Sequence, residues 1–81
     1  MPTLLIKNGF KFFFYANEHE PKHIHVMKGK AYAKVELLSL KVKRSFLKPA
    51  DLKKAIEITA AYQKEFERKW DEFFRRQKNI F

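Results

Sequence analysis

The hydrophobic positions near the start of the chain follow the two-residue period of strands. Two β-prone runs, residues 3–6 and 10–15, flank Lys7-Asn8-Gly9. An Asn-Gly pair between such runs predicts a tight hairpin, because both residues tolerate positive φ. With Asn8-Gly9 as a two-residue turn, the expected pairs are Lys7 with Phe10, Leu5 with Phe12 and Thr3 with Phe14. Apolar side chains then occupy both faces of the hairpin, which is typical of strands covered on both sides.

Two further strands are predicted after a polar loop that contains Pro21. Residues 23–27 form the first, and their alternation separates two sets of side chains: His23, His25 and Met27 on one side, Ile24 and Val26 on the other. Lys28-Gly29-Lys30 predicts a turn, and residues 31–40 predict a fourth strand. Residues 41–44 either extend that strand or form a short strand of their own.

The period changes to that of a helix after Pro49, a residue tolerated in the first turn, where Asp51 also favours the helix dipole. The apolar stripe at 100° per residue comprises Leu52, Ala55, Thr59, Tyr62, Phe66, Trp70, Phe73 and Gln77. These patterns predict an α+β fold in a single domain, residues 1–81. A small antiparallel sheet of about four strands (ββββ), within residues 3–44, is followed by one long C-terminal amphipathic helix over residues 49–78.

Such a helix is longer than the sheet that it covers. Thirty residues span about 45 Å at ~1.5 Å per residue, whereas a strand of six to eight residues covers only ~20–27 Å. Either the helix breaks, or its aromatic end extends past the sheet and packs on another chain. We therefore predict a partner-binding surface, for a small protein partner or a second copy, formed by Phe12, Phe14, Trp70 and Phe74. The alternative is that loops and the C-terminal residues 79–81 cover the apolar surface.

The amino-acid composition limits the cellular compartment and the binding partners that we expect. The chain has no cysteine, which favours a reducing compartment, and no apolar run of signal-peptide or membrane-spanning length, so a cytoplasmic protein without membrane contact is expected. Its net charge is +9. The excess is largest before the predicted helix, where residues 41–48 hold no acid. Four cations there are candidate nucleic-acid-binding residues: Lys41, Lys43, Arg44 and Lys48. A solvated basic surface, or contact with an acidic protein, explains them equally well.

The densest group of reactive side chains lies in residues 18–25. His23 and His25 are two apart on a predicted strand and so share a face. Three interpretations remain open: a structural hydrogen bond that fixes the loop, acid–base catalysis on a phosphate, or metal binding with a third ligand. That ligand would come from His19, Glu18 or Glu20. Glycine-rich phosphate loops, nucleophile elbows and zinc-protease motifs are absent from the sequence, and we assign no metal and no cofactor.

Several segments are distinctive when taken together: Met1-Pro2-Thr3, residues 12–18, the run Glu20-Pro21-Lys22-His23-Ile24-His25-Val26, Ala33-Lys34-Val35 and residues 70–74. With them the chain resembles the bacterial family catalogued as domain of unknown function 4160. The resemblance runs nearly end to end. It implies a small cytoplasmic prokaryotic protein, often encoded beside a second small domain, that forms half of a toxin–antitoxin-like pair. It also implies Glu20, His23 and His25 as site residues. The chain departs from the family pattern in its Lys-rich segment before the helix and in Lys48-Pro49, which replaces a Ser-type cap.

Two functions follow as expectations. The first is the toxin-like component of a two-gene module that acts on or binds RNA. If it is an enzyme, it is a ribonuclease-like acid–base phosphodiesterase in which His23 and His25 are acid and base and Glu20 orients one of them. The second is a non-catalytic module that docks a small protein partner or self-associates.

Overall fold

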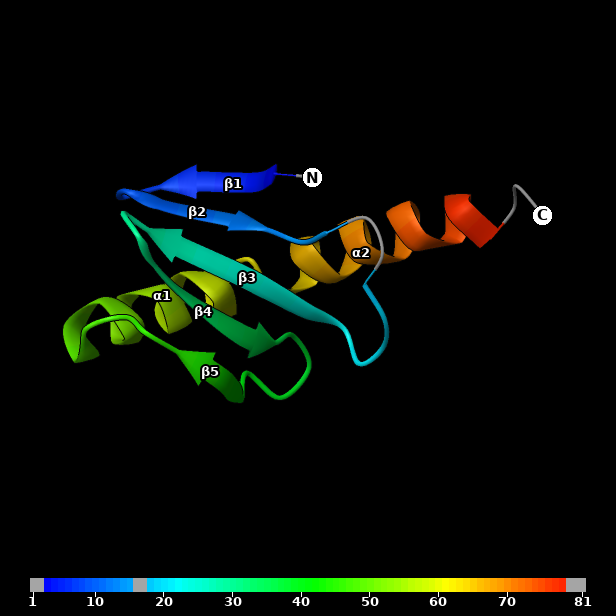
Figure 1. The fold of residues 1–81 in the computed structure, drawn as a ribbon. Coiled ribbons are helices and arrows are strands. Elements are labelled where there is room, and N and C mark those ends of the chain that lie inside the picture. Colours follow the sequence, from blue (N-terminus) through cyan, green and yellow to red (C-terminus); the bar gives the residue numbers. More distant parts are fainter. Residues whose placement is uncertain (1–2, 16–17, 79–81) are drawn as a thin grey trace.

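The computed structural model describes residues 3–15 and 18–78. Its single antiparallel sheet has five strands in chain order: β1 (Thr3–Lys7), β2 (Phe10–Phe13), β3 (His23–Lys28), β4 (Ala31–Glu36) and β5 (Val42–Ser45). Two helices follow, α1 (Pro49–Ala61) and α2 (Gln63–Lys78). The α+β class is confirmed. The sheet has five strands where four were predicted, and two helices stand where one long helix was predicted (Figure 1).

The first hairpin turns at the predicted residues. Asn8 and Gly9 both have positive φ, 53° and 81°, and Lys7 pairs with Phe10 and Leu5 with Phe12 as expected. The third predicted pair is wrong, because the register shifts between Thr3 and Leu5 and Thr3 pairs with Phe13. The shift is a bulge, which puts an extra residue in β1 and changes the facing of its first side chains.

The fifth strand exists because the chain reverses within residues 37–41. Leu40 adopts a φ of 61°, its amide donates to the carbonyl of Glu36, and the Glu36 amide donates to the carbonyl of Lys41. The Ser39 hydroxyl supports this turn by accepting a hydrogen bond from the Lys41 amide. Residues other than glycine rarely take this conformation. Because position 40 is a leucine, no glycine marks the turn in the sequence.

The helical segment is interrupted at Tyr62, whose φ and ψ of −107° and 14° are not helical. The side-chain amide of Gln63, the first residue of α2, donates to the carbonyls of Leu37 and Leu38. This contact ties the start of α2 to the end of β4. We attribute the break to that anchor, because the sequence near Tyr62 contains neither proline nor glycine to bend a helix.

Both helices pack against one face of the sheet. Alternate strand residues point into this core, including Phe12, Ile24 and Val35, and meet Ala55 and Ile58 of α1 and Phe66 of α2. In Figure 1, α1 passes behind β3 and β4, and α2 continues past the ends of the strands. The opposite face carries no helix among the described residues, and we call it the helix-free face. The strand side chains that point away from the core lie on this face, among them His25 and Lys34.

Candidate functional site

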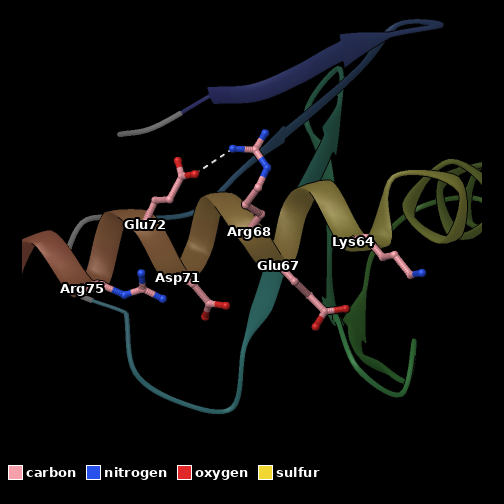
Figure 2. A pocket seen from close by; sticks show the side chains of 6 residues that line it. All are labelled: Lys64, Glu67, Arg68, Asp71, Glu72 and Arg75. Carbon is pink, nitrogen blue, oxygen red and sulfur yellow. Dashed lines mark hydrogen bonds and ion pairs between the residues drawn. The ribbon is translucent and has the colours of Figure 1, made fainter.

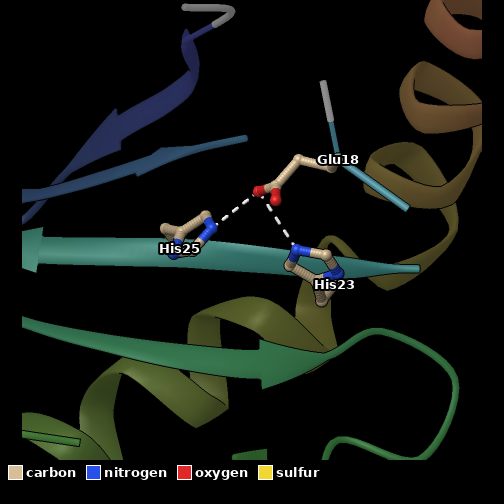
Figure 3. A group of neighbouring side chains, drawn as sticks. All are labelled: Glu18, His23 and His25. Atoms are coloured by element: carbon tan, nitrogen blue, oxygen red, sulfur yellow. Dashed lines mark hydrogen bonds and ion pairs between the residues drawn. The ribbon is translucent and has the colours of Figure 1, made fainter. Parts of the chain in front are cut away.

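Three reactive side chains meet at the start of β3. Glu18, from the segment before β3, directs its carboxylate at two imidazoles of the strand (Figure 3). Its Oε2 atom lies 2.6 Å from Nε2 of His25 and 3.0 Å from Nε2 of His23. We call Glu18, His23 and His25 the His–Glu cluster. Their three ligand-type atoms lie within 4.8 Å of one another.

The orientation of His23 is fixed by the loop and by α2. Its Nδ1 atom lies 2.8 Å from the carbonyl oxygen of Pro21, which can only accept, so Nδ1 carries the hydrogen. Its ring packs 5.2 Å from the Trp70 ring, and the residue is only 4% exposed. Its Nε2 atom is near Glu18 but does not meet hydrogen-bond geometry, and it has no hydrogen-bond partner among the described residues.

His25 occupies an aromatic niche on the helix-free face. Its ring stacks on Phe13 at 5.4 Å and meets the edge of Tyr15 at 5.0 Å. Burial lowers the pKa of His25 below its usual 6.5, and the hydrogen bond to Glu18 offsets only part of this effect. His25 is therefore a neutral imidazole at pH 7, with Nε2–H donating to the carboxylate.

Glu18 is ionised in this arrangement. Burial by itself raises the pKa of a carboxyl group, but contacts with His23 and His25 and a hydrogen bond from the Tyr15 amide outweigh it and lower the pKa of Glu18 below 4.5. The hydrogen bonds from the His25 ring and the Tyr15 amide stabilise the charged form of this carboxylate. The cluster thus combines a carboxylate, a neutral imidazole donor and a second imidazole nitrogen without a hydrogen-bond partner.

A pocket of about 280 Å³ adjoins the cluster. Lys34 and Lys43 are among its lining residues, together with the histidine loop. Its lining comprises Glu18, His19, Glu20, Pro21, His23, Lys34, Glu36 and Lys43. Lys43 lies 3.8 Å from Glu36, so part of its charge is balanced within the pocket. The lining therefore combines two cations, Lys34 and Lys43, with the three carboxylates of Glu18, Glu20 and Glu36. Lys34 is the cation of this pocket that is not paired with Glu36, so it is the candidate contact for a small anion.

The predicted catalytic residues are brought together only in part. His23 and His25 converge, but no hydrogen bond or ion pair in the described part of the chain joins Glu20 to either ring, and Glu18 takes the place expected for Glu20. Glu20 lines the pocket instead. From the sequence, Glu18 was only one of three possible metal ligands. Which of the three reaches the histidines depends on the path of residues 18–22.

The predicted nucleic-acid-binding residues are all exposed, but they are spread out. Lys43 and Arg44 lie on β5, Lys41 just precedes that strand, and Lys48 occupies the N-cap position of α1 without a capping hydrogen bond from its side chain. Strand register places Phe13 and Lys34 in line with two candidate residues, His25 and Arg44. Phe13 pairs with His25, His25 with Lys34, and Lys34 with Arg44, which makes one row across four strands. We call these four residues the cross-strand row.

The predicted partner surface is mostly interior in this structure. Phe12, Phe14 and Trp70 are 0%, 1% and 2% exposed, respectively. Phe14 packs on Trp70, Phe73 and Phe74 at ring distances of 5.3, 5.4 and 5.5 Å, so the aromatic end of the helix covers the chain's own residues. Trp70 and the half-buried Phe74 also border a pocket of about 200 Å³ beside Glu20. These four side chains therefore do not form the continuous exposed surface that the helix length suggested.

A further cavity, of about 330 Å³, lies along the outer side of α2 (Figure 2). Its lining residues are Lys64, Glu67, Arg68, Asp71, Glu72 and Arg75. All of them come from one helix, and Arg68 pairs with Glu72 at 2.7 Å. This is the charged, solvent-facing side of an amphipathic helix, and we do not regard it as a candidate site.

Fold and site together define a class: a small α+β protein with a helix-backed antiparallel meander and a His–Glu cluster at the start of its third strand. The chain belongs to the family described as domain of unknown function (DUF4160), whose model matches residues 9–71. That range is more than half of the chain and contains the whole cluster. No curated protein and no solved structure matches the chain significantly. Within the described residues, neither helix is long and apolar enough to cross a bilayer.

Proposed function

We propose that this protein binds single-stranded RNA on the helix-free face of its sheet and serves as the toxin-like component of a two-gene module. The cross-strand row carries the RNA-binding part of the proposal. It aligns an imidazole and two cations with the buried ring of Phe13 across four strands. The toxin-like role rests on the family resemblance alone.

A sheet face of this kind suits single-stranded RNA because it offers both charge and stacking surface. Lys34 and Arg44 supply cations for phosphates. Exposed rings stand near both ends of the row, Tyr15 after β2 and Phe46 after β5, 45% and 62% exposed. Stacking of a base on such a ring contributes about 1–3 kcal/mol and needs no particular base.

The pocket extends this surface to the His–Glu cluster. Lys34 belongs to both the row and the pocket, and Lys43 stands in the same wall. A phosphate held by these two lysines therefore lies beside Glu18 and His23. The two imidazoles approach the same carboxylate and do not face each other across a gap. In a cleavage reaction the three side chains would therefore act together as one acid–base group, with Glu18 orienting the imidazoles.

Fluorescence anisotropy with a labelled single-stranded RNA tests the binding. Lys34→Ala and Arg44→Ala are expected to weaken affinity and each to reduce the slope of log affinity against log salt by about 0.7. Lys53→Ala, an exposed lysine of α1 on the helical side, is the matched control and should bind like the wild type. Equal losses in all three variants, or no salt-sensitive binding by the wild type, would refute the proposal.

The toxin-like role has its own test. Expression of the wild type in a bacterial host should arrest growth, and co-expression of the neighbouring gene's product should restore it. His25→Ala with unchanged melting is expected to lose the arrest, whereas His19→Ala, an exposed histidine of the same loop, should keep it. Growth unaffected by the wild type at high expression would contradict this role.

A second function, docking of a small protein partner or of another copy, is favoured by the edge of the sheet. β1 is the last strand on its side, and Ile6 on it is 70% exposed. An edge strand with a free hydrogen-bonding side can pair with a strand of another chain. Sedimentation of the wild type and of Ile6→Lys distinguishes the outcomes: association that the variant abolishes supports docking, and a monomer at high concentration opposes self-association.

A further inference from the structure

We infer that Glu18, His23 and His25 bind one divalent transition-metal ion, with Zn²⁺ as the reference ion. Two imidazole nitrogens and one carboxylate oxygen are ligands that zinc prefers, and they converge from one short stretch of chain. The inference does not depend on RNA binding, because it rests on the geometry of the cluster alone.

The distances fit a site that closes on an ion with a small adjustment. Ligands about 2.0–2.2 Å from a tetrahedral ion stand roughly 3.3–3.6 Å apart. The Glu18 oxygen lies nearer than this to both rings, at 2.6 and 3.0 Å, and all three atoms lie within 4.8 Å of one another. The carboxylate must therefore withdraw by less than about 1 Å, which rotation of the Glu18 side chain permits. Metal binding also requires His25 to exchange its Nε2–H for the tautomer protonated on Nδ1, because the hydrogen that now bonds Glu18 occupies the ligand position.

The state of His23 points to a ligand independently. Its Nδ1–H donates to the Pro21 carbonyl, which leaves the lone pair on Nε2. That nitrogen is buried and without a hydrogen-bond partner among the described residues, yet it faces the Glu18 carboxylate. A lone pair that faces a carboxylate is unfavourable unless a proton or a metal ion stands between them. Metal-ligating histidines usually donate their other N–H to a carbonyl or carboxylate, as His23 does.

The neighbouring pocket indicates what such an ion would do. Glu18 and His23 belong to the pocket wall, so the ion faces a space of about 280 Å³ that also holds Lys34 and Lys43. Three protein ligands leave a coordination position for water or substrate, as in catalytic zinc sites. An anionic substrate, such as a phosphate ester, matches the two lysines on that side.

Titration calorimetry on chelator-treated protein without an affinity tag tests the site, with ZnCl₂ as the probe. One equivalent is expected to bind the wild type. Glu18→Gln, His23→Gln and His25→Gln should each weaken binding by more than about 100-fold, beyond the 10–100-fold typical for the loss of an outer hydrogen-bond partner. His19→Gln is the matched control, because His19 is exposed, four residues from His23 and outside the cluster.

Binding that is lost equally in His19→Gln would overturn the inference, and so would failure of the wild type to bind zinc. Because replacing a cluster residue also affects folding, a second measurement uses only wild-type protein. Titration with ZnCl₂ monitored by NMR of the histidine side-chain nitrogens should shift Nε2 of His23 and His25 and leave His19 unchanged. Shifts confined to His19, or equal on all three rings, would refute the site. RNA binding measured in a chelator separates this result from the proposed function.

Discussion

The two faces of the sheet are built from the same strands but have opposite character. The helix-covered face presents Phe12, Ile24 and Val35, each fully buried, to α1 and α2. The helix-free face presents His25, Lys34 and Arg44, with exposed rings nearby. Side chains alternate between the two faces of a strand. Packing of the buried side chains therefore fixes the backbone, and the backbone fixes where the polar side chains of the other face lie.

This difference explains how so short a chain can hold a reactive cluster in a defined geometry. His25 follows Ile24 and precedes Val26, both 0% exposed, so its place on β3 is set by core packing on the other side. Glu18 has no such support from a strand and depends on its hydrogen bonds to His25 and the Tyr15 amide. Packing therefore fixes the positions of the imidazoles more firmly than the position of the carboxylate.

The largest expected effect comes from removing a ring from the covered face. Phe12→Ala should lower the free energy of unfolding by about 3–5 kcal/mol, because the ring is fully buried between β3 and α2 and leaves a cavity. Phe46→Ala, on a ring that is 62% exposed, is the control and should change stability by no more than about 0.5 kcal/mol. Urea unfolding followed by Trp70 fluorescence measures both. Similar losses would show that the two faces are not distinct.

A smaller effect is expected at the anchor between the sheet and α2. Gln63→Ala removes the donor to the Leu37 and Leu38 carbonyls and should cost about 0.5–1.5 kcal/mol. Hydrogen exchange should show faster opening of the first turn of α2. Lys64→Ala, at the exposed neighbouring position, should leave both quantities unchanged. If Gln63→Ala is neutral, the helix break has another cause.

The smallest effect concerns the ion pair between Lys22 and Asp71, 2.8 Å apart, which joins the loop before β3 to α2. The hydrogen bond to Asp71 raises the pKa of Lys22 above 10.5, so the pair stabilises the fold below that pH and the stabilisation is lost as pH rises through the folded pKa. Because Asp71 is 41% exposed, Asp71→Asn should cost at most about 1 kcal/mol. Denaturant unfolding of wild type and variant should converge at high pH and in high salt. A constant difference would indicate that the charge of Lys22 is not its source.

Local signals predicted the parts of the fold that depend on neighbours in sequence. Asn8-Gly9 placed the first hairpin, and Pro49 marked the start of the helical segment. The sequence leaves the turn before β5 open between two alternatives, because Leu40 takes a positive φ without being glycine. The break at Tyr62 was missed because its anchor, Gln63, bonds residues more than twenty positions away.

For the candidate site as well, the sequence predicted what depends on local spacing and not what depends on the path of a loop. Period-two spacing put His23 and His25 together, but the choice of Glu18 over Glu20 depends on how the loop returns to β3. The expected second apolar face was misjudged for a similar reason. Phe13 is 2% exposed because Lys11, Tyr15 and His25 cover its ring, and none of these contacts can be read from hydrophobicity.

Amide chemical-shift mapping of the full chain with a short single-stranded RNA tests the central claim, that the helix-free face is the functional surface. We expect shifts concentrated on β3, β4 and β5, largest around His25, Lys34 and Arg44, with the outer side of α2 unaffected. Shifts confined to the charged residues of α2, or the absence of any saturable shift at low salt, would contradict it.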